Sequence, residues 1–236
     1  MQVFYAPDIK DNTCALDKNE SRHCIRVLRM MKGNPVKLID GRGNLFEGYI
    51  TDPDPDRCEI AITGTFSNFE KRGYRLHIGI SPLKNQDRFE WFVEKSVELG
   101  VDEITPVICL NTEKPGIKAE RINNIIISAM KQSLKASKPV LNEPIAFDKF
   151  IAFDFNAVKL IAHCNPGFER NKIDSVYVRN MDAVILIGPE GDFSGDELTF
   201  AINNGFNPVH LGSSRLRTET AGIAACHSVY FINQNP

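Results

Sequence analysis

The residues best suited to chemistry lie in two glycine-containing turns near the C-terminal end of this 236-residue chain. The first turn, residues 188–192 (Gly-Pro-Glu-Gly-Asp), follows the five apolar residues 183–187. The second turn, residues 212–217, leads into Thr218 and Glu219. Glycine allows the backbone to approach a ligand closely, and open α/β sheets bind ligands at the carboxyl ends of their strands. The two turns should therefore lie side by side at that edge and form a ligand site.

The chemistry of the first turn restricts the kind of ligand. Glu190 and Asp192 place two carboxylates where a bound anion would have to sit. The turn also lacks the Gly-Lys-Ser/Thr of a P-loop and the G-x-G-x-x-G spacing of a dinucleotide turn. A nucleotide with several phosphates is disfavoured, and a neutral or positively charged ligand such as S-adenosylmethionine fits better. Alternatively, both carboxylates are solvated residues that favour the N-terminus of the next helix.

Alternating strands and helices are predicted to position these turns. The apolar patterns predict strands at residues 76–80, 104–110, 158–162, 183–187 and 208–211, and helices at 87–99 and 117–136. A capping-box spacing from Ser194 to Glu197 predicts a further helix that ends at Gly205, and a last helix follows the second turn. Such alternation indicates a parallel sheet with helices on both faces, which we expect over residues 74–236.

The first part of the chain has a different pattern. Short strands are predicted at residues 3–6, 36–39, 45–50 and 58–63. A single helix should begin near Asp17 or Asn19 and continue to about Met31. Strands this short and close together predict a small β-barrel over residues 1–70, joined to the α/β domain by the polar stretch 67–73.

The composition, with 42% hydrophobic and 25% charged residues, is typical of a globular protein with a sizeable core. No apolar run has the length of a membrane span, and the first residues do not resemble a signal peptide, so a cytoplasmic location is expected. The six cysteines form no Cys-x-x-Cys pair and the five histidines are dispersed. We therefore expect reduced thiols and no metal site.

Two C-terminal motifs carry a resemblance that extends along nearly the whole chain. Residues 187–194 read Ile-Gly-Pro-Glu-Gly-Asp-Phe-Ser, and residues 215–221 read Arg-Leu-Arg-Thr-Glu-Thr-Ala after a Leu-Gly pair. Weaker matches are His23 with residues 27–29, the pair 40–41, and residues 95–101 before 104–106. Together these motifs resemble the SPOUT-class ribosomal RNA small subunit uridine-N3 methyltransferases.

The resemblance implies an N-terminal PUA-like β-barrel that helps to hold RNA. It also implies a C-terminal SPOUT domain with a trefoil knot, which general topology rules would not have predicted. The implied reaction is methylation of uridine N3 in small-subunit (16S) ribosomal RNA, with S-adenosylmethionine as cofactor. The implied partners are ribosomal RNA, within the small ribosomal subunit, and a second copy of the chain in a homodimer.

The cofactor residues follow from the same resemblance, position by position, whereas the catalytic roles are our own hypothesis. We expect Arg217 to stabilise the uracil anion that develops during methyl transfer, and Glu219 to position Arg217 or accept the proton. Without the resemblance, Glu219 reads as a first-turn carboxylate that favours the helix N-terminus. The cofactor would be held by three strand-end loops that contain His163, Ile187, Gly188, Pro189, Glu190, Gly191, Leu211, Gly212, Leu216 and Thr218.

Two sets of basic residues have the spacing of a helical stripe. They are Arg22, Arg26 and Arg29 in the first helix, and Lys131, Lys135 and Lys138 at the end of the long helix. Each stripe would neutralise RNA phosphates. A solvated helix face has the same pattern, and this alternative stays open.

The chain departs from the family pattern at three places. Asp192 stands where glycine is usual, Ser213 and Ser214 replace an expected proline, and Lys135 and Lys138 lie in a segment that often carries arginine. Two other functions remain possible from the sequence. One is a SPOUT enzyme that methylates a ribose 2′-hydroxyl of transfer or ribosomal RNA, and the other is a non-catalytic RNA-binding module.

Overall fold

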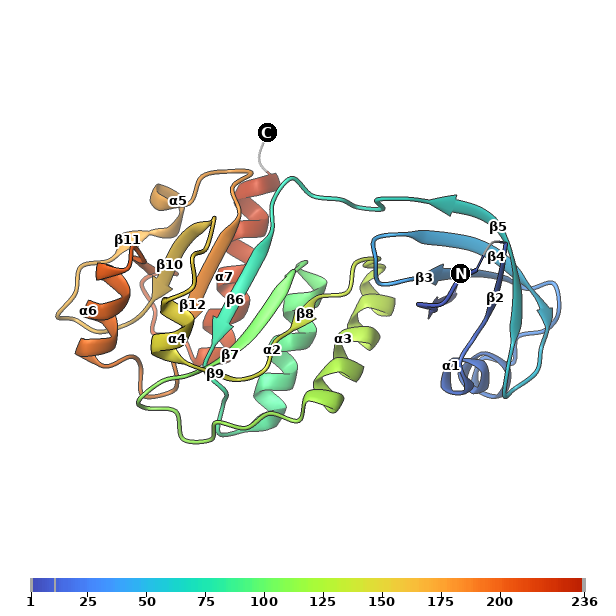
Figure 1. The fold of residues 1–236 in the computed structure, drawn as a ribbon, viewed down its shortest axis with the longest axis horizontal. Coiled ribbons are helices and arrows are strands. Elements are labelled where there is room, and N and C mark those ends of the chain that lie inside the picture. Colours follow the sequence, from blue (N-terminus) through green and yellow to red (C-terminus); the bar gives the residue numbers. More distant parts are fainter. Residues whose placement is uncertain (1, 11, 235–236) are drawn as a thin grey trace. The chain divides into compact units, whose positions relative to one another are not determined.

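A five-stranded and an eight-stranded sheet form the frame of the computed structural model, which describes residues 2–10 and 12–234. The contacts among residues separate the chain into two units (Figure 1). The first unit runs to Lys71 and also includes Ile127–Lys138. The second contains Arg72–Ile126 and the residues from Pro139 onward.

The sheet of the first unit is mixed, and it contains the four strands that the sequence predicts and one more. Its strands are β1 (Gln2–Tyr5), β2 (Thr13–Ala15), β3 (Pro35–Ile39), β4 (Leu45–Asp52) and β5 (Glu59–Phe66), in the order β1-β3-β4-β5-β2. The strand β1 is parallel to β3, and the other pairs are antiparallel. Alternate residues such as Val36, Leu38 and Ile60 point into an apolar core that includes Phe4. The predicted hairpin of β3 and β4 is confirmed.

The predicted helix from residue 17 or 19 to about Met31 is wrong in its length and its type. Asp17 caps α1 (Lys18–Arg22) by accepting the Glu20 N–H at 2.8 Å, but the chain then enters the π-helix η1 (His23–Val27). The Leu28 N–H donates to the carbonyl oxygen of His23, five residues earlier, at 3.0 Å. Arg29 has a left-handed backbone (φ 53°), so the helix ends before it.

The second unit is built on an entirely parallel sheet. Its strands are β6 (Leu76–Ile80), β7 (Glu103–Ile108), β8 (Val140–Leu141), β9 (Ile145–Ala146), β10 (Val158–Ala162), β11 (Asn171–Lys172), β12 (Ala183–Ile187) and β13 (Asn207–His210). The order is β11-β13-β10-β12-β6-β7-β8, with β9 paired to β7. The predicted strands 76–80, 158–162 and 183–187 have the observed bounds. Parallel pairing of strands that alternate with helices confirms the predicted α/β fold class.

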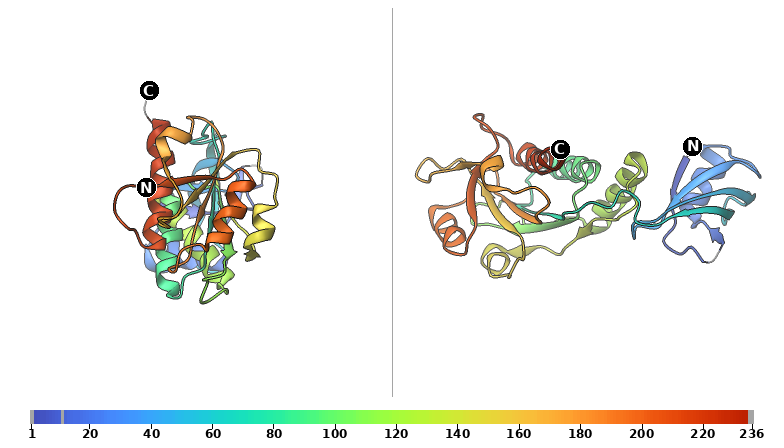
Figure 2. Two further views of the ribbon diagram at one scale, coloured as in Figure 1. Left: turned by 90° about the vertical axis from the view of Figure 1, so that its left-hand side faces the viewer. Right: turned by 90° about the horizontal axis from the view of Figure 1, so that it is seen from above.

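Helices cover both faces of this sheet. They are α2 (Gln86–Glu98), α4 (Phe147–Ile151), α5 (Ile173–Val176), α6 (Gly195–Asn203) and α7 (Thr218–Gln234). The helix α3 (Ala119–Ser133) begins in the second unit and ends in the segment that belongs to the first. Helices α2 and α7 pack on one face, and α4 and α6 lie on the other (Figure 2). The helix predicted at 117–136 ends earlier, at Ser133, because Leu134 adopts a left-handed conformation (φ 57°). No helix within the described residues is long and apolar enough to cross a membrane.

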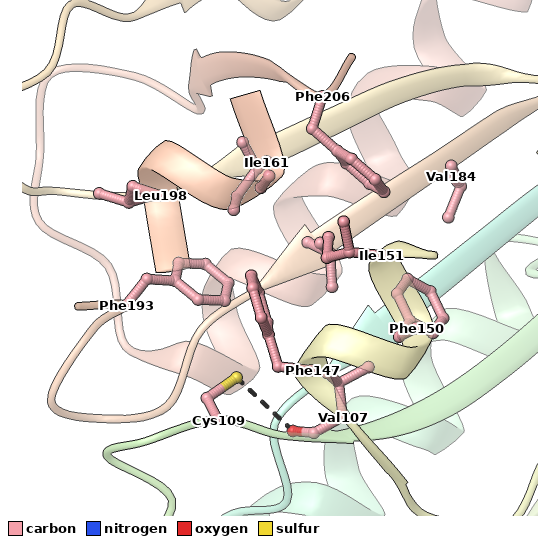
Figure 3. Close-up of a cluster of buried hydrophobic side chains, with 12 residues drawn as sticks. Val107, Cys109, Phe147, Phe150, Ile151, Ile161, Val184, Phe193, Leu198 and Phe206 are labelled. Carbon is pink, nitrogen blue, oxygen red and sulfur yellow. Dashed lines mark hydrogen bonds between the residues drawn. The ribbon is translucent and has the colours of Figure 1, made fainter. Parts of the chain in front are cut away.

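A cluster of aromatic and aliphatic side chains fills the space between the sheet and the helices α4 and α6. Phe147 and Phe150 from α4 meet Phe193 and Phe206, which flank α6 (Figure 3). All five residues of β12 are buried, as expected for a central parallel strand. Gly79 leaves room for Phe150, since an added Cβ would lie 2.8 Å from its ring. This core fixes the strand ends that carry the loops described below.

The predicted capping box at the start of α6 is confirmed. The Glu197 N–H donates to Ser194 Oγ at 3.1 Å, and the Ser194 N–H donates to Glu197 Oε2 at 2.8 Å. The second carboxylate oxygen of Glu197 accepts the N–H of Leu110 at 2.8 Å. Glu197 therefore starts the helix and also ties it to the loop that follows β7.

His77 on β6 makes the stability of the protein depend on pH. Burial lowers its pKa; Glu103 opposes this effect and Arg75 adds to it. The folded state therefore holds His77 neutral, while the unfolded chain takes up a proton near its ordinary pKa of about 6.5. Its contribution to stability is full above that pH and is lost as the pH falls from there toward the lower folded-state pKa. We expect urea denaturation to give a smaller free energy of unfolding at pH 5.5 than at pH 7.5.

The variant His77→Phe tests this expectation, because phenylalanine keeps the edge-on contacts with Phe150 and Phe155 but does not titrate. It removes the hydrogen bond between Nε2 and Thr105 Oγ1 (2.7 Å) at every pH, so the variant should be less stable throughout. Its loss of stability between pH 7.5 and 5.5 should nevertheless be smaller than that of the unmodified protein. An equal loss in both proteins would show that His77 is not the group responsible.

Candidate functional site

A cavity of about 440 Å³ lies at the carboxyl ends of three neighbouring strands of the second unit. The strand β10 lies between β13 and β12. The two glycine turns, which the sequence predicts to lie side by side, are therefore separated by the loop after β10. The cavity wall contains every predicted cofactor residue except Gly191: His163, Ile187, Gly188, Pro189, Glu190, Leu211, Gly212, Leu216 and Thr218. Arg217 and Glu219 line it as well.

Gly191 lies instead against an adjoining hollow, which it shares with Asp192, Cys164 and Ser213. A Cβ at this position would lie 3.1 Å from the Cβ of Asn111, so the glycine allows the loop after β7 to approach. Its role in cofactor binding stays a prediction.

His163 is the most unusual side chain of the cavity wall. It is only 4% exposed, and neither imidazole nitrogen has a hydrogen-bond partner among the described residues. Its ring contacts Phe168 edge-on, with 6.0 Å between the centroids. Burial lowers the pKa of His163; Asp192 opposes this effect and Arg170 adds to it. A neutral imidazole that lines a cavity without a partner is suited to hydrogen-bond a ligand.

The turn after β12 is braced by contacts outside the cavity. Glu190, whose side chain is exposed, accepts the N–H of Lys84 at 3.1 Å and so connects the turn to the loop after β6. A Cβ on Gly188 would lie 3.0 Å from the ring of Phe193, which explains why glycine is needed there. The carboxylate of Glu190 therefore has a structural contact, which the two readings of the sequence did not include.

Asp192 has a left-handed backbone (φ 64°), a region that favours glycine. Its two carboxylate oxygens accept the N–H groups of Phe193 and Cys164, each at 2.8 Å. The second of these bonds joins the loop after β12 to the loop after β10. Compared with the glycine that is usual in the family, Asp192 makes this backbone conformation less favourable, but its carboxylate links two loops of the cavity wall.

Arg217 and Glu219 differ in their surroundings. Arg217 is exposed, and none of the described carboxylates lies within ion-pair distance of its guanidinium. Glu219 is buried, 6% exposed, and its Oε1 lies 3.8 Å from Nε of Arg88. The ion pair of Glu219 is therefore with Arg88, and the predicted positioning of Arg217 by Glu219 finds no such contact.

Sequence reasoning missed several residues of the cavity wall that carry chemistry: Arg88, Cys164, Arg170, His210 and Arg215. Arg88 lies in the first turn of α2, directly after β6. No pattern in the sequence indicates Arg88, because it reaches the cavity only through the pairing of β6 with β12. That pairing is known from the strand order of the structure.

The basic residues of the first unit do not form the predicted stripes. The π-helix breaks the α-helical spacing at Arg26, and Arg29 lies beyond the helix end. Of the three lysines, only Lys131 lies on α3, since Lys135 and Lys138 follow its end at Ser133. The physical reason in both segments is a left-handed residue that ends the helix early.

Three of the same six residues are already paired with carboxylates. Arg22 lies 3.1 Å from Asp56, Lys135 lies 3.0 Å from Glu70, and Lys131 pairs with Glu20. In the part of the chain that the structure describes, Arg26, Arg29 and Lys138 have no ion pair.

The parallel sheet with its three-loop cavity and the separate mixed sheet define the class of RNA methyltransferases that carry a PUA domain. A model of the RNA methyltransferase domain matches residues 70–230, and a model of the RNA methyltransferase PUA domain matches residues 16–63. The chain belongs to the family of ribosomal RNA small subunit methyltransferase E. Its relative of that name from Mesomycoplasma hyopneumoniae is 32% identical over 220 residues, which cover 87% of this chain and 93% of the relative.

Solved structures agree with this assignment. A probable rRNA-methyltransferase from Porphyromonas gingivalis is 43% identical with a TM-score of 0.93, and the match covers 99% of both chains. The ribosomal RNA small subunit methyltransferase E of Neisseria gonorrhoeae, bound to S-adenosyl methionine, is 29% identical with a TM-score of 0.84, over 98% of both chains.

Proposed function

We propose that this protein transfers the methyl group of S-adenosylmethionine to N3 of a uridine in small-subunit (16S) ribosomal RNA. The observation that carries the proposal is the cavity at the ends of β10, β12 and β13, with a buried and unpartnered His163 in its wall. Membership of the family and the cofactor bound by the Neisseria gonorrhoeae relative support the same reading.

The residues of the cavity fit this cofactor. A volume of about 440 Å³ lies in the usual range for small-molecule sites. Gly188 and Gly212 (φ 127°) bring backbone close to the cavity, and Ile187, Leu211 and Leu216 supply apolar walls. The wall carries carboxylates at Glu190 and Asp192 and four guanidinium groups, so it can meet both the positive and the negative groups of the cofactor. When bound, S-adenosylmethionine supplies an activated methyl group.

The catalytic task of the protein is to stabilise charge on the base. N3 of uracil carries a proton and pairs, so the base must leave its stack and the proton must leave or be offset. We assign to the unpaired guanidinium of Arg217 the stabilisation of the developing uracil anion, through orientation and electrostatics. Glu219, buried beside Arg88, is the candidate to accept the proton.

Arg88 has a supporting role in this scheme. Its guanidinium is the only positive group in the described residues within ion-pair distance of the Glu219 carboxylate, so it is placed to orient that carboxylate. We therefore add Arg88 to the site as the residue that holds Glu219.

We assign RNA binding to the first unit, which carries the PUA match. Of the six basic residues in the two predicted stripes, Arg26, Arg29 and Lys138 have no intramolecular ion pair among residues 2–10 and 12–234. Such groups are available to neutralise phosphates. Arg22, Lys131 and Lys135 would first have to exchange their carboxylate partners, so we expect smaller contributions from them.

The remaining expectations are the trefoil knot, the homodimer and the cytoplasmic location, all of which stay predictions. A groove lined by Lys95, Leu99, Ile223, Ala224 and His227 supports the homodimer, because it combines an apolar floor with small residues on α7. Gly222 and Ala225 are buried within the chain itself and are not free for a partner.

Methyl transfer to naked 16S ribosomal RNA, compared with transfer to assembled small subunits, tests the function directly. The product should be a nucleoside methylated at uracil N3, mapped by mass analysis of the digested RNA. A product methylated on a ribose 2′-hydroxyl would refute the proposal and indicate a different target for the same cofactor. RNA binding without any binding of S-adenosylmethionine in calorimetry would instead indicate a non-catalytic module.

A further inference from the structure

The peptide group between His163 and Cys164 is held at both of its polar atoms by charged side chains that lie outside the strand. Asp192 Oδ2 accepts the N–H of Cys164, the next residue, at 2.8 Å. Arg170 Nη1 donates to the carbonyl oxygen of His163 at 2.8 Å. Because both polar atoms of the peptide group that follows His163 are bonded to ions, the loop after β10 has little freedom to move the imidazole.

Asp192 is itself well fixed. Its Oδ1 accepts the N–H of Phe193 at 2.8 Å, and its own N–H donates to the carbonyl oxygen of Pro189 at 2.9 Å. Asn111 Nδ2 donates to the carbonyl oxygen of Asp192 at 3.0 Å. Because both the backbone and the carboxylate of Asp192 are fixed, its bond to Cys164 ties the position of the β10 loop to that of the β12 loop.

The imidazole of His163 makes no hydrogen bond to any other residue of the described chain. It is 96% buried, lies in the cavity wall, and leaves both nitrogens without a partner. Polar atoms buried in this way are rare unless a ligand or water satisfies them. The charged groups that face the ring are Asp192 and Arg170, of opposite sign, and burial favours the neutral form.

We propose that Asp192 is a positioning residue for cofactor recognition: with Arg170 it holds His163 so that the imidazole hydrogen-bonds a neutral polar group of S-adenosylmethionine. A neutral imidazole offers one donor and one acceptor, which matches the ribose hydroxyls or the adenine ring. The ammonium and carboxylate of the methionine part each use only one of these two functions. The inference rests on the proposed function, since it names how the same cavity selects its cofactor.

The binding of S-adenosylmethionine to the full chain, measured by calorimetry at pH 7.5, tests the role of His163. The variant His163→Phe should bind about 10-fold more weakly, because it loses the hydrogen bonds of the ring. The variant His163→Gln, which keeps one donor and one acceptor, should recover most of the affinity. Equal affinities of His163→Phe and the unmodified protein would overturn the assignment of His163.

Asp192→Gly separates positioning from folding. Glycine accepts the backbone angle of φ 64° without strain, so the thermal midpoint should not fall by much, whereas the affinity should drop several-fold as the link to Cys164 is lost. Asp196→Ala is the matched control, because this aspartate is exposed, lies four residues further on, and does not line the cavity. Its affinity should equal that of the unmodified protein.

A double variant distinguishes action through His163 from a general effect on the loop. If Asp192 acts through the imidazole, His163→Phe combined with Asp192→Gly should bind no more weakly than His163→Phe alone. Fully additive losses would overturn the positioning role.

Nuclear magnetic resonance of labelled imidazole gives a second readout. Loss of the Asp192 charge in Asp192→Gly should lower the pKa of His163, and cofactor binding should shift the ring nitrogen signals. A pKa that does not move, with signals unchanged on binding, would contradict the inference. If the unmodified protein binds no S-adenosylmethionine at all, the proposed function itself fails, which is a different result.

Discussion

Replacing Arg217 by alanine should slow methyl transfer about 100- to 1,000-fold, which is the usual effect of removing one group that stabilises transition-state charge. The guanidinium lines the cavity, is exposed, and is not neutralised by any carboxylate of the described residues, so its charge is available to the base. The affinity for S-adenosylmethionine should change little. Single-turnover rates on 16S ribosomal RNA, together with calorimetry of the cofactor, measure the two effects separately.

Two further variants sharpen this test. Arg217→Lys keeps the charge but loses the planar fork, and should recover part of the rate. Arg179→Ala removes an exposed arginine of the same unit that does not line the cavity, and should leave the rate unchanged. An Arg217→Ala protein that transfers methyl groups at the full rate would remove Arg217 from the catalytic machinery.

Gly222→Ala should destabilise the protein by about 1–3 kcal/mol and weaken cofactor binding, although alanine normally favours a helix. An added Cβ would lie 2.5 Å from Cε2 of Phe92 and 3.2 Å from Cδ1 of Ile80. Phe92 is fully buried and cannot move aside, so α7 must shift away from α2. Thr218 and Glu219 begin the same helix, so the shift reaches the cavity wall.

Urea denaturation and calorimetry of the cofactor measure these two effects. Gly195→Ala is the matched control, because its Cβ would meet nothing within 4 Å and its helix position needs no special backbone angle. The substitution Phe92→Leu in a Gly222→Ala protein should restore part of the stability, because the smaller side chain leaves space for the added methyl group. A Gly222→Ala protein as stable as the Gly195→Ala control would contradict the predicted clash.

The parallel sheet was predictable because its strands are signalled locally. The five apolar residues of β12, the capping box at Ser194 and the glycine after α6 each mark a boundary within a few residues of sequence. The first helix was not predictable in the same way. Its π-helical turn and the left-handed Arg29 depend on hydrogen bonds that no spacing rule describes, and this broke the predicted basic stripe.

The candidate site divides in a similar manner. The glycines could be identified because they follow predicted strands directly, whereas Arg217 was assigned through the family motif. Arg88 and Asn111 could not, since they come from loops and helices after β6 and β7 and enter the site only through the order of the strands. The role of Asp192 also needed the structure, because the value of its carboxylate depends on the N–H of Cys164, 28 residues earlier.

The connectivity of the first unit has a practical consequence for dissecting the protein. The chain leaves that unit after Lys71 and returns for residues 127–138. The returning segment supplies the partners of Glu20 and Glu70, and the Lys138 N–H donates to the carbonyl oxygen of Gly41 at 2.8 Å. A fragment cut at the predicted linker therefore carries an incomplete RNA-binding module, while the remaining fragment carries an unpaired piece of it. Exchange of this module between relatives requires both segments to be transplanted together.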